Sequence, residues 1–236
     1  MTQSRLRFGT FIAPHTPPEE HPALALEQDM DRVVWLDKLG FDEAWIGEHH
    51  SGGWEITSSP ELFIAAVSQR TQNIRLGTGV SSLPYHHPYT LADRIRQLDY
   101  HTKGRAMFGV GPGSLPSDSH MMGLATAQAR DQMDEAIEPL VRLLNGETVT
   151  AKSDWFELND AQLQFVSYNE RGVEMAVASQ VSPTGATAAG KHGLGLLSIG
   201  ATSAGGFNAL ASNWAIAEEA ANDHGKTVDR SAWRLV

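Results

Sequence analysis

The feature that most restricts the fold of this sequence is a regular alternation of short apolar runs and longer segments with helical periodicity. The short runs have the length of buried strands, and the longer segments repeat apolar residues at intervals of three and four. This alternation is typical of a parallel sheet whose strands are connected by helices. Strands are predicted at 6–13, 41–47, 74–83, 106–110, 173–178 and 195–199, with a further one starting at 233. Helices are predicted at 24–39, 60–70, 88–100, 128–144, 183–192 and 207–224.

A closed (β/α)8 TIM-type barrel is the fold that we expect, and a doubly wound open sheet is the alternative. Residues 1–236 are expected to form a single domain, because α/β barrels of about 200–250 residues do so. Segment 148–166 interrupts the alternation and is predicted to form a β-hairpin around Asn159–Asp160. The last apolar run, Trp233–Val236, starts only the seventh of eight units. The C-terminal units are therefore expected to be missing, and the chain to be a truncated or incompletely recorded form of a longer protein.

Charge and composition argue against several functional classes. The chain has 18 basic and 28 acidic residues, a net charge of −10, and its richest basic stretch, Arg94–Arg105, holds four Lys or Arg. Nucleic-acid binding is therefore disfavoured, because it needs clustered positive charge. No apolar run approaches the roughly 20 residues that span a bilayer, and no signal-peptide core follows Met1–Arg7. The chain has no cysteine, so disulfides are excluded and a cytoplasmic location is expected.

Polar or glycine-rich loops follow four consecutive predicted strands, at residues 48–53, 81–88, 109–114 and 179–184. In a parallel barrel the functional residues lie at the C-terminal ends of the strands and in the loops after them. The four loops are therefore expected to share one rim, and we predict the ligand site there.

Two pairs of adjacent histidines, His49–His50 and His86–His87, lie in these loops. Histidine suits proton transfer near neutral pH, and a Glu–His–His run at a strand end is poor core material. His49–His50 is therefore predicted to be functional. His86–His87 can join an acid–base cluster or pack in a turn, and packing is the preferred interpretation. A metal-dependent hydrolase using all four is a weaker alternative, because adjacent strand residues point to opposite faces; no metal site is predicted.

The loop after the fourth strand contains Gly111, Gly113 and Ser114. Its glycines allow close approach of the backbone to a flat ligand, although a flexible turn is the structural alternative. A dinucleotide-binding pattern is weak here, because its third glycine position is occupied by Ser114. No helix is expected to begin in this loop, which should continue through Leu115, Pro116 and Asp118.

Ser182–Pro183 predicts the start of a helix, with Ser as N-cap and Pro in the first turn. Free amides at a helix N-terminus suit a phosphate, and Thr184 adds a hydroxyl. Arg130, near the start of another predicted helix, is a candidate counter-charge. An ordinary capped helix and a solvated arginine are the structural alternatives.

Five segments carry a resemblance to a known family: RFGTF at 7–11, GFDEAWIGEHH at 40–50, IRLGTGVSSLPYHHP at 74–88, KGRAMFGVGPGS at 103–114 and AAGKHGLGLLSIGATS at 188–203. Through these segments the chain resembles the bacterial luciferase-like flavin-dependent monooxygenases over nearly its whole length. The last segment is most similar to the terpene-oxidising, limonene monooxygenase-like members.

This resemblance implies a chemistry. Family members use reduced flavin, usually FMN delivered by a separate reductase, together with O2. The flavin forms a C4a-peroxide that oxygenates a small organic substrate, and homodimers are common. A deazaflavin (F420) branch also exists, so F420 or FAD is a less favoured alternative to FMN. A non-catalytic flavin-binding subunit is a further alternative, since the family contains inactive chains. The sequence does not specify the substrate.

The resemblance also assigns residues. His49 matches the catalytic histidine of luciferases, and Gly79–Val80 matches a non-prolyl cis peptide that faces the flavin ring. Arg130 and the loop containing Ser179, Gln180, Ser182 and Thr184 match the phosphate-binding region. Two departures affect its details: Ser179–Gln180 stands where the family has Glu–Ser, and Pro112 stands where luciferase has an arginine.

A flavin peroxide needs a pocket that excludes water. Phe8, Phe11, Trp45 and Met107 are candidate apolar walls, with ordinary core packing as the alternative.

Overall fold

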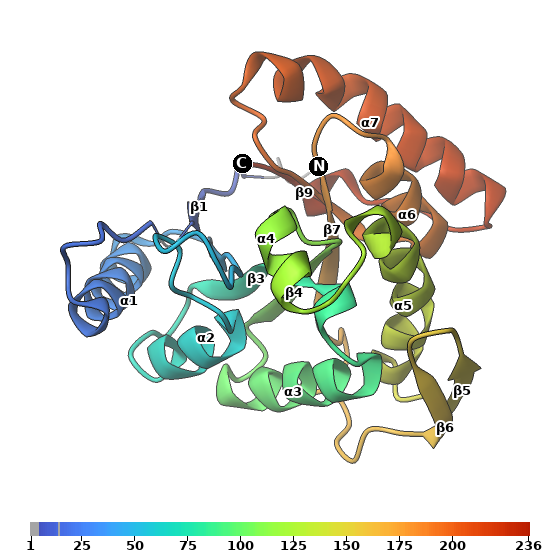
Figure 1. Cartoon of the computed structure of the whole chain (residues 1–236), viewed down its shortest axis with the longest axis horizontal. Coiled ribbons are helices and arrows are strands. Elements are labelled where there is room, and N and C mark those ends of the chain that lie inside the picture. The colour runs from blue at the N-terminus through green and yellow to red at the C-terminus, as the bar shows by residue number, and fades with distance from the viewer. Residues whose placement is uncertain (1–4, 14) are drawn as a thin grey trace.

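The computed structural model describes residues 5–13 and 15–236, so the first four residues of Met1–Arg7 lie outside it. A parallel seven-stranded sheet, in the order β1-β2-β3-β4-β7-β8-β9, forms its centre (Figure 1). The strands are β1 Gly9–Ile12, β2 Glu43–Ile46, β3 Arg75–Ser82, β4 Ala106–Gly111, β7 Glu174–Ser179, β8 Gly195–Ser198 and β9 Trp233–Leu235.

The sheet is curled. Glu43 on β2 and Arg234 on β9 would lie about 24 Å apart in a flat sheet, since they are five strands apart at about 4.8 Å each. The structure places Arg234 Nη2 2.8 Å from Glu43 Oε1. Arg7, just before β1, also donates to the carbonyl of Ser231, just before β9. This curvature is that of a half-barrel and favours the expected barrel architecture over a doubly wound sheet.

Helices cover the outer face of the sheet (Figure 1). Proline in the first turn, which needs no N–H partner there, starts several of them, as at Pro22, Pro60 and Pro88. The main core lies between the helices and the sheet, with Val33, Ile64 and similar apolar side chains fully buried. The helices are α1 Pro22–Leu39, α2 Pro60–Ser68, α3 Pro88–His101, α4 Pro116–Met121, α5 Ala129–Leu144, α6 Thr184–His192 and α7 Ala204–Asp223.

The long connection from β4 to β7 departs from the simple alternation. It contains α4 and α5 and then an antiparallel pair, β5 Val149–Lys152 and β6 Glu157–Ala161. The pair lies within the segment expected to form a hairpin, but the expected turn at Asn159–Asp160 is wrong: these residues lie in β6, and the turn is at 153–156. The expectation of a continuous loop through Leu115–Asp118 is wrong, because Pro116 opens a helical turn that places Asp118 in its buried position.

The inner face of the curled sheet holds a small second core of Trp45, Met107, Ala176 and Leu197. Trp45 fits because β3 contributes Gly77 beside it: a methyl group on Gly77 would lie 2.6 Å from the indole ring. This packing explains why position 77 is glycine, although glycine usually weakens the interior of a strand.

A layer of charge closes the same interior at the N-terminal ends of the strands. Arg234 forms a bidentate pair with Glu43, at 2.8 and 3.0 Å, and a second pair with Glu174 at 2.5 Å. Trp45 Nε1 donates to Glu43 at 3.1 Å, and Arg75 reaches Glu174 at 2.6 Å. Burial alone would raise the pKa of Glu43, but the Arg234 hydrogen bonds outweigh it and the pKa is lowered.

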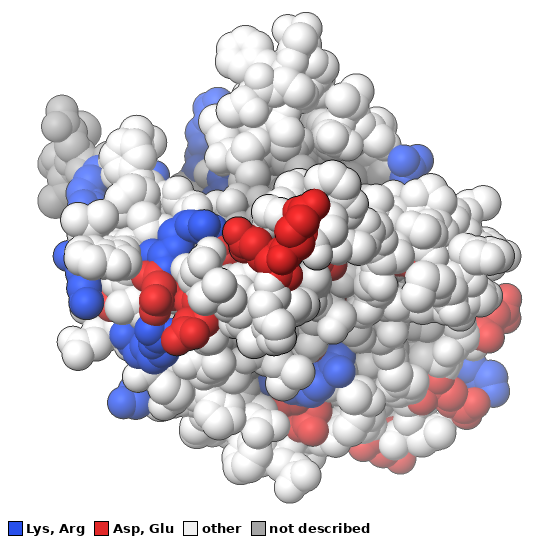
Figure 2. All heavy atoms as spheres, turned by 60° about the vertical axis from the view of Figure 1, so that its left-hand side comes forward, with Lys and Arg blue, Asp and Glu red and all other residues white. Residues whose placement is uncertain are grey.

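The outer face toward α1 and α2 carries mixed charge (Figure 2). Arg70 pairs there with Asp31, and Arg32 pairs with Asp29. Within the described residues, no helix has both the length and the apolar character that crossing a bilayer requires.

Candidate functional site

A cavity of about 840 Å³ opens at the C-terminal ends of the sheet strands. It lies at the predicted rim, because residues from the loops after β2, β4 and β7 and from the C-terminal half of β3 line it. β1, β8, the segment before α5, and α5 itself complete the walls. The lining residues are Phe11, Ala13, Gly47, Glu48, His49, Gly79, Val80, Ser82, Pro112, Gly113, Ser114, Thr126, Ala127, Ala129, Arg130, Met133, Ala178, Ser179, Gln180, Val181, Ser182, Thr184, Gly185 and Ile199.

Most of the residues predicted for cofactor binding border this cavity. They are Gly79, Val80, Gly113, Ser114, Arg130, Ser179, Gln180, Ser182 and Thr184. Gly111 does not line it; its place is beneath Val80, because a methyl group on Gly111 would lie 2.7 Å from the Val80 side chain. The Gly79–Val80 peptide is cis, as the family resemblance implies.

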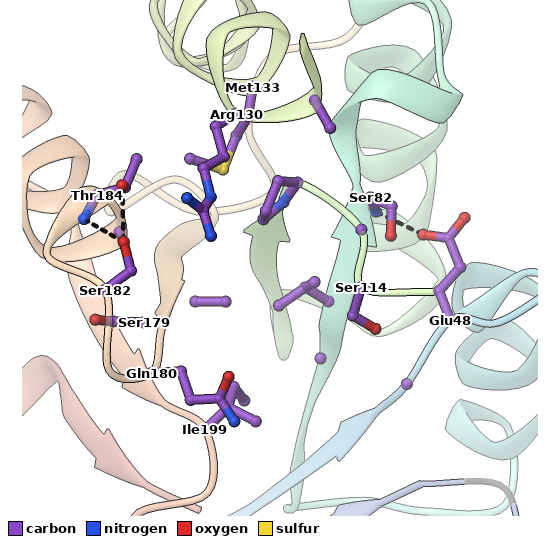
Figure 3. Close-up of a pocket in the computed structure, with 18 of the residues that line it drawn as sticks. Glu48, Ser82, Ser114, Arg130, Met133, Ser179, Gln180, Ser182, Thr184 and Ile199 are labelled. Atoms are coloured by element: carbon purple, nitrogen blue, oxygen red, sulfur yellow. Dashed lines mark hydrogen bonds between the residues drawn. The ribbon is translucent and has the colours of Figure 1, made fainter. Parts of the chain in front are cut away.

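Arg130, Ser182 and Thr184 lie at one end of the cavity (Figure 3). The Arg130 side chain extends from the first turn of α5 toward the cavity, and the two hydroxyls lie across from it at the start of α6. Ser182 Oγ accepts from the Thr184 amide at 3.4 Å and lies 3.0 Å from Thr184 Oγ1. The helix begins at Thr184 with Pro183 at the N-cap position and no side-chain cap, so the prediction of Ser182 as N-cap with Pro183 in the first turn is wrong by one residue. Among the described residues that line the cavity, Arg130 is the one Lys or Arg, so this end attracts an anion.

The position of α6 depends on Gly185. A Cβ there would lie 2.0 Å from the carbonyl oxygen of Ala178 and 3.0 Å from the Cα of Ser179. Gly185→Ala is therefore expected to push α6 away from β7 and lower the free energy of unfolding by about 1–3 kcal/mol. Urea denaturation measures this. Gly205→Ala in α7 is the control, since its methyl group meets only Val181 Cγ2 at 3.6 Å; comparable destabilisation by both variants would contradict the prediction.

His49, in the loop just after β2, also lines the cavity. Its Nε2 lies 2.9 Å from Glu55 Oε2, and its Nδ1 lies 3.5 Å from Asp118 Oδ2. The Asp118 carboxylate is buried and also accepts from the His50 amide at 3.3 Å and from the Ser51 hydroxyl. The imidazole is thus held between two carboxylates at the edge of the cavity, which suits acid–base chemistry.

His50 and His86 belong to a different arrangement, centred on the buried carboxylate of Glu48. Both place Nε2 on Glu48 Oε1, at 2.9 and 2.8 Å, while Oε2 accepts from the Ser82 amide at 2.6 Å. Arg94 donates to His86 Nδ1 at 3.0 Å, so His86 carries its proton on Nε2. Burial would raise the pKa of Glu48, but the hydrogen bonds from His50 and His86 lower it overall, and Glu48 raises the pKa of His50. This cluster ties the loop after β2 to β3.

The four histidines therefore do not converge on one point. His87 lies apart from the others, edge-on to Phe156 with ring centroids 6.4 Å apart. The arrangement does not supply the shared His set that the metal-dependent hydrolase alternative requires, and no group of three metal-ligating side chains gathers within residues 5–13 and 15–236.

Sequence reasoning missed Glu55 and Asp118, the two partners of His49. Asp118 lies in a segment that the sequence predicts to be a loop, and Glu55 lies outside the Glu–His–His run at 48–50. Three of the four proposed apolar walls are wrong. Phe8 is 59% exposed, while Trp45 and Met107 are buried inside the curled sheet. Phe11 does line the cavity, and Met133 and Ile199 supply apolar surface that was not expected.

Comparison with known proteins identifies the family. Residues 6–232 match the family described as Luciferase-like monooxygenase. The chain belongs to this family. The luciferase-like chain is 50% identical over 231 residues to limonene 1,2-monooxygenase of Rhodococcus erythropolis, covering 98% of the chain and 59% of that protein. It is 48% identical over 234 residues to 4-hydroxyprotoasukamycin monooxygenase of Streptomyces nodosus subsp. asukaensis, covering 98% of the chain and 63% of that protein.

A solved structure agrees with the luciferase-like architecture. The oxygenating constituent of 3,6-diketocamphane monooxygenase from Pseudomonas putida, a type II Baeyer–Villiger monooxygenase in complex with FMN, superposes with a TM-score of 0.84 and 28% identity. The match covers 97% of this chain and 66% of that one. The luciferase-like chain thus spans about six tenths of the length of the two sequence relatives, at 59% and 63%.

Proposed function

We propose that this chain is the flavin- and substrate-binding part of a monooxygenase that oxygenates a small organic molecule with reduced flavin and O2. The observation that carries the proposal is one cavity that is lined both by an anion-binding end at Arg130, Ser182 and Thr184 and by the imidazole of His49. The strand curl and the family membership support a (β/α)8-type barrel as the complete architecture.

The residues of the cavity fit a flavin mononucleotide. The cavity volume of about 840 Å³ lies within the range of roughly 300–1,000 Å³ that is typical of ligand pockets. The flavin phosphate would lie against the α6 N-terminus, the hydroxyls of Ser182 and Thr184, and the Arg130 guanidinium. The flat ring would lie against Gly79–Val80 and the apolar surface of Phe11 and Ile199. Ser179 adds a buried hydroxyl that has no hydrogen-bond partner among the described residues.

When bound, reduced flavin supplies the electrons that activate dioxygen. The chain contributes position, exclusion of water and proton transfer. Val80, Met133 and Ile199 present apolar surface that limits water near the ring. His49 exchanges protons at the cavity edge, and Asp118 holds the loop that carries it.

The names of the relatives support FMN as cofactor and a small cyclic terpene or ketone as substrate class. FMN is present in the diketocamphane monooxygenase structure, and limonene is the substrate named for the Rhodococcus enzyme. F420 and FAD are the less favoured cofactors. A separate flavin reductase and a homodimer remain predictions, as does a non-catalytic role as the alternative function.

Arg130→Ala tests the phosphate end. A hydrogen bond to a charged group contributes about 1.5–3 kcal/mol, so the FMN dissociation constant is expected to rise roughly 10- to 100-fold. Fluorescence titration with FMN, reduced FMN and F420 measures affinity and cofactor choice. Riboflavin, which lacks the phosphate, should bind wild type and Arg130→Ala equally.

Arg142→Ala is the matched control for this titration. Arg142 lies on the same helix but pairs with Glu147 at 2.9 Å and is not part of the cavity wall. Its loss should leave FMN affinity unchanged. Absence of saturable binding by wild type to any of these flavins would overturn the proposed function.

A further inference from the structure

A row of alternating imidazoles and carboxylates runs from the cavity to the surface. His49 Nε2 lies 2.9 Å from Glu55 Oε2, and His15 Nδ1 lies 3.2 Å from Glu55 Oε1. The two carboxylate oxygens thus each contact a different imidazole. Glu55 has no role in the flavin-binding arrangement, and neither Glu55 nor His15 lines the cavity.

The exposure of the three side chains changes along the row. His49 is 20% exposed and Glu55 is 16% exposed, whereas His15 is 66% exposed. A proton at His49 therefore has one partly buried carboxylate between it and an imidazole that is open to solvent. Distances near 3 Å are those over which protons transfer between heavy atoms.

The backbone holds this row in place. His15 and Glu55 form an isolated antiparallel bridge, and the Thr16 amide donates to Trp54 O at 2.5 Å. On the other side, the His49 amide donates to Thr57 O at 3.0 Å. The loop from His49 to Glu55 reverses direction at Gly52 and Gly53, whose positive φ angles of 89° and 73° favour glycine. The segment after β1 and the loop after β2 are thereby fastened together with Glu55 at their junction.

The charged partners of the carboxylates in this row are imidazoles, with which a carboxylate can exchange a proton. The groups that face His49 are Glu55 and Asp118, with His50 and Glu48 adjacent in the loop. Within the part of the chain that the structure describes, no Lys or Arg forms an ion pair with Glu55 or Asp118. A guanidinium or ammonium would fix the negative charge on Glu55, whereas an imidazole can give up or accept its proton.

We propose that Glu55 and His15 form a proton path between His49 and solvent, an inference that rests on the proposed function of His49. A proton on His49 Nε2 moves to Glu55 Oε2, and a turn of the carboxyl group presents it to His15 Nδ1. His15 then releases a proton from Nε2 to water. The reverse sequence supplies a proton to the cavity. Each transfer breaks one N–H or O–H bond and forms another, with no oxidation or reduction.

The coupling along the row can be measured without flavin or substrate. In 15N spectra of the imidazole nitrogens, His15→Ala is expected to shift the His49 titration midpoint in the wild-type background. In the Glu55→Gln background the same substitution should leave the His49 midpoint unchanged, because the amide cannot carry the proton. Equal shifts in both backgrounds would overturn the coupling. The charge states of Asp118, Glu48 and His50 are common to all four proteins and cancel in the comparison.

Turnover tests the path in the holoenzyme. With reduced FMN and limonene, or the best substrate found for wild type, Glu55→Gln is expected to lower kcat by on the order of 10-fold, less than the 10²–10⁴ typical of the acid–base group itself. FMN affinity should not change. His15→Ala should lower kcat less, and added imidazole should restore it because His15 is exposed. His120→Ala is the control, because His120 is exposed and lies outside the row. Its kcat should equal that of wild type and should not change when imidazole is added.

The outcomes separate this proposal from the proposed function. Loss of activity in His49 variants, with wild-type kcat and no imidazole effect in Glu55→Gln and His15→Ala, would remove the path and leave the monooxygenase assignment intact. Failure of wild type to bind flavin would remove the assignment itself. If Glu55→Gln melts well below wild type, the His15→Ala variant and its imidazole rescue decide the question, because His15 lies at the surface.

Discussion

His49→Ala is expected to lower kcat by on the order of 10²–10⁴ while leaving FMN affinity within a few-fold of wild type. The imidazole lines the cavity but is not one of the groups at the proposed phosphate end, Arg130, Ser182 and Thr184, so its loss leaves the proposed phosphate contacts in place. A positioned acid or base acts on the rate of proton transfer more than on binding of the ground state. Turnover, flavin affinity and melting temperature should be measured on one preparation.

Two variants on the neighbouring histidines serve as controls for His49→Ala. His50→Gln and His86→Gln each remove one imidazole that contacts Glu48, and among the described residues the side chain of His86 contacts Glu48 and Arg94 rather than Glu55 or Asp118. They are expected to lower stability more than chemistry, since the cluster fixes the loop after β2. Activity that falls only in proportion to the folded fraction in all three variants would contradict a special role for His49. Unchanged turnover in His49→Ala would remove it from the mechanism.

The sequence predicts the strands and helices well because each buried element carries its own periodicity. β7, with five apolar or small side chains after Glu174, and α5, with Met133, Ile137 and Leu140 on one side, are examples. The rim of loops also follows from order along the chain, since parallel strands end at the same edge. Gly79, Val80, Arg130 and Ser182 are predicted in this way or through the family resemblance, and all four line the cavity.

Contacts between segments that are distant in sequence could not be predicted from periodicity or from the order of the strands. Glu55 reaches His15 across 40 residues, and Asp118 reaches His49 across 69. Neither partner lies in a periodic segment or a motif. The prediction that Trp45 lines the cavity is wrong for a related reason. The sequence pattern of a strand is the same whether its tryptophan faces the ligand cavity or the interior below it. The glycine at 77 is the signal that distinguishes them, but it acts only once β2 and β3 are in register.

The charged layer at the opposite end of the sheet gives the second large expected effect. Glu43→Gln is expected to lower the free energy of unfolding by about 3 kcal/mol, the lower end of the range for breaking a buried ion pair. The variant leaves Arg234, whose side chain is 9% exposed, with Glu174 as its remaining carboxylate partner at 2.5 Å. Because Arg234 keeps its pair with Glu174, we expect a loss of unfolding free energy at the lower end of that range. Urea denaturation at pH 7 measures the loss.

Glu157→Gln is the matched control for Glu43→Gln. Glu157 pairs with Lys152 at 2.8 Å, but both side chains are more than half exposed. Exposed pairs contribute at most about 1 kcal/mol, so this variant should unfold nearly as wild type does. Equal losses from the buried and the exposed pair would contradict the importance of the charged layer.

The pH dependence of the stability of Glu43→Gln provides a further test, because the pKa shifts determine the direction in which it should differ from wild type. Glu43 and Glu174 have pKa values below the ordinary 4.5 in the folded chain: burial raises each of them, and the contacts with Arg234 and Arg75 outweigh it. Their stabilisation is therefore fully present above pH 4.5, and it is lost as the pH falls through the folded values, because the unfolded chain binds protons first. Glu43→Gln removes one of these groups, so its stability should fall less steeply on acidification than that of wild type. The two stability curves should converge toward low pH; curves that stay parallel from pH 7 to below pH 4.5 would mean that Glu43 stabilises the fold through packing alone.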